Sequence, residues 1–140
     1  MDAEIWAKAH GAATHFPVAL AMCAVAFDAA GFALARRAIG HDLRAAGYWT
    51  MILGAAGTVP AVLSGLMMTK GKVLGHDALR LHHLFVWPAF ALLVGLGTWR
   101  VIQGRQVSRP AFAGYLALAG IAAALLVVAA YWGGELMIAS

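Results

Sequence analysis

The chain has 140 residues, of which 63% are hydrophobic and only 11% are charged, and its formal net charge is +4. Soluble domains are about half apolar and about a quarter charged, so this composition excludes a soluble globule, a disordered chain and a nucleic-acid-binding protein. The single cysteine excludes an intrachain disulfide and a CxxCH site for covalent haem attachment.

Four apolar stretches, each bounded by charged residues or helix breakers, follow one another along the chain. They cover residues 16–35, 48–69, 81–99 and 111–132. Each has roughly the 20 residues that an α-helix needs to cross the hydrocarbon of a bilayer. The sequence therefore predicts an all-α fold, an integral membrane four-helix bundle with both termini on the same side, as one domain over residues 1–140. The segment before residue 15 is expected to form a short interfacial helix.

Charge between the spans predicts the orientation. The loops after the first and third spans carry six arginines, whereas the N-terminal segment and the loop after the second span carry four lysines and arginines. By the positive-inside rule, the arginine-rich loops face the cytoplasm and both termini face the periplasm. His41 is expected as a solvated residue of the first arginine-rich loop.

Two features of the spans concern helix packing. Gly57, Ala61 and Gly65 recur every four residues in the second span and form a stripe of small side chains that lets another helix approach closely. Pro60 and Pro88 lie inside spans, where each removes a backbone donor and is expected to kink its helix.

One acid, Asp28, lies well inside the first span. An ionisable group in a membrane span is costly unless it is paired, and it marks a functional candidate. Asp28 is either a proton-relay acid or the partner of an arginine reaching in from the opposite interface, such as Arg36 or Arg100.

Five of the six histidines gather at one end of the predicted bundle. His10 and His15 precede or open the first span, and His76, His82 and His83 precede or open the third. These two spans run parallel, so their N-terminal ends emerge on the same face, which also holds both termini. Alternatively, these histidines lie at the membrane interface, where they cap helix ends and bond lipid headgroups. Five such side chains at one end of the bundle favour a functional site instead.

Imidazole is a common ligand of haem iron, copper and zinc, and two histidines on facing helices can hold one non-covalent haem b between them. We expect His15 and His83 to be the axial ligands. His82 is the close rival of His83, because adjacent helical residues point about 100° apart and normally only one faces the core. His10 and His76 are further alternates.

Other side chains at this end are candidates to assist. Arg80 is expected to meet the haem propionates, together with Lys70 and Lys72. Copper is the alternative cofactor, bound by the same histidines with Met67 and Met68.

The residues from His10 to Leu20 resemble the opening of the small four-span bacterial membrane proteins classed as domain of unknown function 2231. That family typically begins with a histidine and, five residues later, a second histidine followed by Phe-Pro, as at His15-Phe16-Pro17 here. Its third-span histidine resembles His82 or His83. The resemblance implies a four-helix protein of the bacterial inner membrane, and family members are often linked to periplasmic electron-transfer modules such as Rieske or cytochrome domains.

These features predict a membrane-embedded subunit that binds haem b near the outer face and passes electrons between quinol and a periplasmic or membrane redox partner. With so little mass outside the membrane, a non-catalytic subunit of a redox complex is favoured over a complete enzyme. The alternatives are a copper- or other metal-handling membrane protein and a cofactor-free membrane anchor. Membrane lipid is the expected surrounding, and quinone is a candidate partner.

Overall fold

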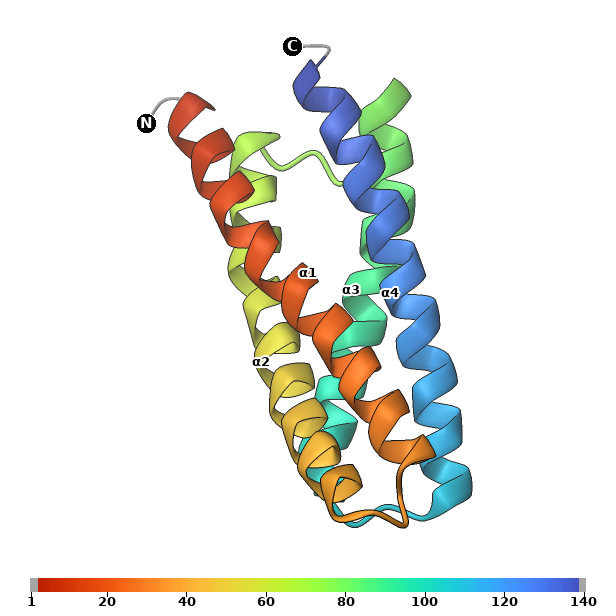
Figure 1. Cartoon of the computed structure of the whole chain (residues 1–140). Helices are drawn as coiled ribbons and strands as arrows, with labels where there is room; N and C mark the ends of the chain where they lie inside the picture. The colour runs from red at the N-terminus through yellow and green to blue at the C-terminus, as the bar shows by residue number, and fades with distance from the viewer. Residues whose placement is uncertain (1–2, 139–140) are drawn as a thin grey trace.

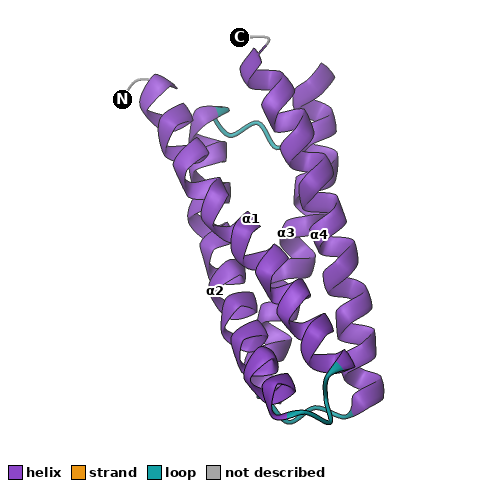
Figure 2. Cartoon of the chain, viewed as in Figure 1, coloured by secondary structure: helices purple, strands orange, loops and turns teal. Residues whose placement is uncertain are grey.

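Four helices form an up-and-down bundle in a computed structural model of the chain, which describes residues 3–138 (Figures 1 and 2). The helices are α1 (Ala3–Ala33), α2 (Ala38–Met68), α3 (Asp77–Gln103) and α4 (Arg109–Ile138). All four are long and apolar enough to cross a membrane, and no strand occurs within the described range. α1 begins and α4 ends at one end of the bundle, which we call the terminal end (Figure 1). The predicted all-α, four-span membrane fold is confirmed.

The helices run beyond the apolar stretches at both ends. α1 has 31 residues. At ~1.5 Å per residue this gives ~46 Å, compared with the ~30 Å of hydrocarbon to be crossed. The described part of the segment before residue 15 is continuous with α1, so it is not the separate interfacial helix that we expected. α2 begins at Ala38, which places His41 and Arg44 on its first two turns rather than in a loop. Charged residues end an apolar stretch but not a helix, because arginine and lysine are good helix formers.

The bundle consists of two helix pairs. α1 packs along α2, and α3 packs along α4; α2 also contacts α3, and a smaller contact joins α1 to α4. α1 and α3 therefore face each other across the bundle axis. The core residues that α1 contributes, Ala21, Ala24 and Asp28, belong to its second half, so the pairs are held together chiefly at the end opposite the termini, which we call the loop end. Figure 1 shows α1 and α4 meeting there.

Small residues set the distance between neighbouring helices. A Cβ added at Gly57 would lie 3.3 Å from a side chain of α1, and one added at Gly65 would lie 2.9 Å from another. On α3, a Cβ added at Gly97 would lie 2.5 Å from the Cβ of Ala55 on α2. The predicted small-residue stripe on the second span is thus confirmed as a helix-packing surface, and it faces α1.

A buried polar network ties all four helices together at the loop end. Asp28 of α1 is 0% exposed and Arg100 of α3 is 1% exposed. The Arg100 Nη2 lies 3.0 Å from the Asp28 Oδ1, and the Tyr115 hydroxyl of α4 donates to the Asp28 Oδ2 at 2.8 Å. Gly47 of α2 packs so closely on this carboxylate that an added Cβ would collide with it. The prediction that Asp28 pairs with an arginine is confirmed, with Arg100 as the partner.

Candidate functional site

Three of the five histidines at the terminal end are buried or half-buried in the bundle. They are His10 of α1 and His82 and His83 of α3, and we call them the histidine cluster. His10 belongs to the α1–α2 pair and the other two to the α3–α4 pair, so the cluster spans both pairs. The ring centroids of His82 and His83 are 5.7 Å apart, and that of His83 lies 6.1 Å from the centroid of Trp87. The cluster therefore brings together residues that are more than 70 positions apart in the sequence.

His10 is held in place by α2. Its Nδ1 lies 2.9 Å from the Ala61 carbonyl oxygen and 3.3 Å from the Ser64 Oγ. Because a carbonyl oxygen only accepts, Nδ1 carries the proton, and the Nε2 of the neutral ring keeps its lone pair free. The ring lies over Gly65, where an added Cβ would come within 2.9 Å of the His10 Cε1. The small-residue stripe therefore makes room for this imidazole against α2.

His82 is held by α4 in the same way. Its Nδ1 lies 2.8 Å from the Ala129 carbonyl oxygen, so its Nε2 is also free in the neutral ring. A Cβ added at Gly133 would lie 3.3 Å from the His82 Nδ1. Ala129 and Gly133 are four residues apart, as are Ala61 and Gly65. Each helix pair thus holds one histidine by an alanine carbonyl and a glycine one turn further on, although no repeat is visible in the sequence.

His83 completes the cluster from the interior of the bundle. It is 7% exposed, and its Nδ1 is buried without a hydrogen-bond partner in the described part of the chain. Leaving a buried polar atom unpaired costs about 1–3 kcal/mol, so the His83 Nδ1 is available to a hydrogen-bond partner. The neighbouring Trp87 is fixed by its Nε1, which donates to the Val73 carbonyl oxygen at 2.8 Å.

His15 lies on a different face of α1. Its side chain is exposed, and its Nδ1 bonds to the carbonyl oxygen of Gly11 in its own helix. Five helical residues turn through about 500°, so His10 and His15 point about 140° apart and cannot both face the bundle interior. Ligation by His15 and His83 stays a prediction. The geometry favours two of the alternates, His10 and His82.

The remaining predicted residues of the terminal end surround the cluster without entering it. His76 is the N-cap residue of α3, is exposed, and makes no side-chain capping bond. Arg80 is exposed near the start of the same helix, and Lys70 and Lys72 are exposed in or beside the loop before it. Met67 is 54% exposed on the outer side of α2. The expected contact between Arg80 and a haem propionate stays a prediction.

His10 and His82 each keep Nε2 free in the neutral ring, as an imidazole that binds a metal does. No group of three or more His, Cys, Asp or Glu side chains with metal-binding geometry occurs among residues 3–138. Copper and zinc sites are commonly built from three or four protein ligands, whereas a haem iron takes at most two axial ligands from the protein.

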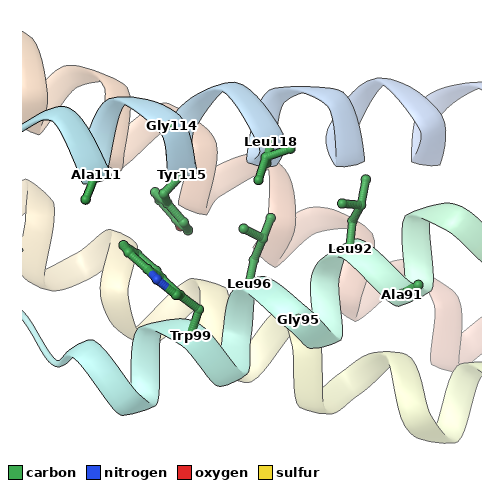
Figure 3. A pocket seen from close by; sticks show the side chains of 9 residues that line it. All are labelled: Ala91, Leu92, Gly95, Leu96, Trp99, Ala111, Gly114, Tyr115 and Leu118. Carbon is green, nitrogen blue, oxygen red and sulfur yellow. The ribbon is translucent and has the colours of Figure 1, made fainter.

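An apolar groove of about 450 Å³ runs between α3 and α4, nearer the loop end (Figure 3). Gly95 and Trp99 line it from α3, and Gly114, Tyr115 and Leu118 line it from α4. The Trp99 and Tyr115 rings are stacked, with centroids 5.4 Å apart and planes at 13°. The sequence did not predict this groove, because glycines in a uniformly apolar span do not reveal whether a helix or open space faces them.

Comparison with known proteins identifies the family. The family model described as "Predicted membrane protein (DUF2231)" matches residues 8–139. No curated protein and no solved structure matched the chain. Because the match covers nearly the whole chain, the chain belongs to this family, as the resemblance around His10 and His15 indicated.

Proposed function

We propose that this member of the DUF2231 family is a membrane-embedded electron-transfer subunit that binds a b-type haem, with His10 and His82 as axial ligands. The proposal depends on one observation: each of these imidazoles gives its Nδ1 proton to a backbone carbonyl of the neighbouring helix. Histidines that bind metals characteristically donate their other ring N–H in this way, which fixes the ring and leaves Nε2 for the metal. The cores of four-helix bundles are common sites for such cofactors.

The residues around the cluster have separable roles in this proposal. Gly65 and Gly133 make room for the imidazole rings, and the alanine carbonyls fix their tautomers. His83, with its free Nδ1, is placed to hold a proton or a hydrogen bond beside His82, and Arg80 is available to a carboxylate at the membrane surface. A bound haem would supply one-electron transfer, while the protein supplies burial and orientation.

The predicted electron donor, quinol, has a candidate site in the groove between α3 and α4. The groove is apolar, opens between two membrane-spanning helices and has a stacked aromatic wall at Trp99 and Tyr115 (Figure 3). Gly114→Leu would fill it, and we expect slower reduction of the haem by quinol with unchanged reduction by dithionite. Gly120→Leu, on the same helix and outside the groove, is the matched control. Equal quinol rates in all three proteins would contradict this assignment.

The proposed setting is the bacterial inner membrane, with the terminal end and its histidines toward the periplasm and a periplasmic or membrane redox protein as the electron acceptor. The arginine-rich loop end supports this orientation through the positive-inside rule.

The experiment that tests the proposal is a reduced-minus-oxidised visible spectrum of the purified protein, recorded together with metal analysis. We expect the sharp bands of a low-spin, bis-histidine haem b. A colourless protein with stoichiometric copper would support the metal-handling alternative instead. A protein with neither haem nor metal would support the cofactor-free anchor.

A further inference from the structure

We propose that the loop end of the bundle holds a binding pocket for the phosphate of an anionic phospholipid headgroup. A cavity of about 230 Å³ lies between the first turns of α2 and the segment that joins α3 to α4. It is lined by His41, Arg44, Ala45, Arg105 and Gln106. None of these five residues is acidic, two are arginines, and one is a histidine. The lining therefore favours an anion, independently of any cofactor at the terminal end.

Arg44 lines this cavity, and an aromatic ring fixes its guanidinium group. Its guanidinium carbon lies 4.3 Å from the centroid of the Phe112 ring, which positions the planar group by stacking. Its Nη2 is buried and has no hydrogen-bond partner within the described range. That atom has almost no solvent-accessible surface, so an oxyanion in the cavity would meet the other, cavity-lining atoms of Arg44 and pair with its charge.

Arg100, although close by, is already neutralised. Its Nη2 is bonded to the Asp28 carboxylate at 3.0 Å and also lies 3.4 Å from the Arg44 carbonyl oxygen. The Asp28 charge is thus engaged mainly by Arg100, and the guanidinium of Arg44, which also acts on that charge, makes no ion pair with it in the described part of the chain. The other nearby acid, Asp42, is exposed and follows His41 on α2, where it points about 100° away around the helix.

A glycine turn brings the second arginine to the pocket. Gly104 ends α3 with a φ of 66°, a left-handed conformation that favours glycine, and its N–H donates to the Arg100 carbonyl oxygen at 2.9 Å. The chain then turns toward the start of α2, so that Arg105 and Gln106 line the cavity. Two guanidinium groups and a carboxamide offer several N–H donors, a set that suits the oxygens of a phosphate.

The position of the pocket points to a lipid as the source of that phosphate. It lies near the ends of helices that are long and apolar enough to cross a membrane, which would place it at the level of the headgroups. The loop end is the side that the positive-inside rule places in the cytoplasm, where the leaflet carries anionic lipids. Basic pockets between membrane helices on this side are suited to anionic headgroups.

The test is native mass spectrometry of the purified full-length protein in detergent, titrated with phosphatidylglycerol or with phosphatidylcholine of the same acyl chains. We expect tighter binding of phosphatidylglycerol. Loss of a hydrogen bond to a charged group is worth at least about a tenfold change in affinity, so Arg105→Gln should weaken phosphatidylglycerol binding about tenfold. Arg37→Gln is the matched control, because Arg37 is exposed at the same end but does not line the cavity.

The outcomes separate the possibilities. Equal binding of the two lipids, or an equal loss in the Arg105→Gln and Arg37→Gln proteins, would overturn the proposal. Arg105 is exposed, so its replacement leaves the fold intact, whereas Arg44→Gln also removes the stacking on Phe112 and serves as a second variant. A titration with glycerol 3-phosphate distinguishes the sources: if it displaces the lipid, the phosphate is what the pocket recognises, and if it binds while neither lipid does, the lipid source is wrong.

Discussion

Replacing Asp28 by alanine is expected to destabilise the bundle strongly. The substitution leaves the buried guanidinium of Arg100 without its counter-ion, 3.0 Å away in the wild type, and leaves the Tyr115 hydroxyl without its acceptor. Breaking a buried ion pair from one side costs about 3–5 kcal/mol. Because Tyr115 also loses a hydrogen bond to a charged group, we expect the free energy of unfolding to fall by about 5 kcal/mol.

The assay is reversible unfolding in mixed micelles of increasing SDS content, followed by the helical circular dichroism signal. Tyr115→Phe removes only the hydroxyl and should cost about 1.5–3 kcal/mol. Removing both charges in Asp28→Leu with Arg100→Met should restore stability to within about 1–3 kcal/mol of the wild type, because an apolar pair of similar volume can replace a buried ion pair while the Tyr115 hydroxyl stays without its acceptor. A double variant as unstable as Asp28→Ala would refute the explanation by an orphaned charge.

Two further predictions concern the histidine seat and the orientation. Gly65→Ala should displace the His10 ring by about 0.5 Å, since the added Cβ would start 2.9 Å from Cε1 and ordinary contact begins at 3.4 Å. Disturbing an outer-shell partner typically costs 10- to 100-fold in metal affinity, so the haem content should fall while that of Gly120→Ala, where nothing lies within 4 Å, stays at the wild-type value. The orientation can be tested with single cysteines introduced into a Cys23→Ser background. In cells with a permeabilised outer membrane, a cysteine in place of Lys70 should react with an impermeant maleimide, and a cysteine in place of Arg37 should not. The reverse pattern would show that the termini are cytoplasmic.

The fold could be predicted from the sequence because hydrocarbon imposes a length and a composition on every span. The ends of the helices could not, since hydropathy stops at the first charges while the helix continues into the headgroups. His41 illustrates this limit: it was expected in a loop and lies instead on the first turn of α2. The pairing of Asp28 was foreseeable for a related reason, because a carboxylate at that depth requires a cation.

The grouping of the histidines at one end could also be predicted, because it follows from the parallel course of the first and third spans. The choice among them could not, since it depends on which face of each helix meets a neighbour. The angle of about 140° between His10 and His15 shows that both cannot face the bundle interior, but it does not tell which of them does. Gly65 and Gly133 lie against the His10 and His82 rings. Their role in making room for these rings can be recognised only from the contacts between helices.

The measurement that tests the central proposal most directly is the haem-to-protein ratio of three variants purified side by side. We predict that His10→Ala and His82→Ala each lose most of the haem, because each removes an anchored imidazole. His15→Ala should retain the wild-type ratio, since that side chain is exposed and bonded to its own helix. Loss of haem from His15→Ala, together with retention in His10→Ala or His82→Ala, would contradict the assignment.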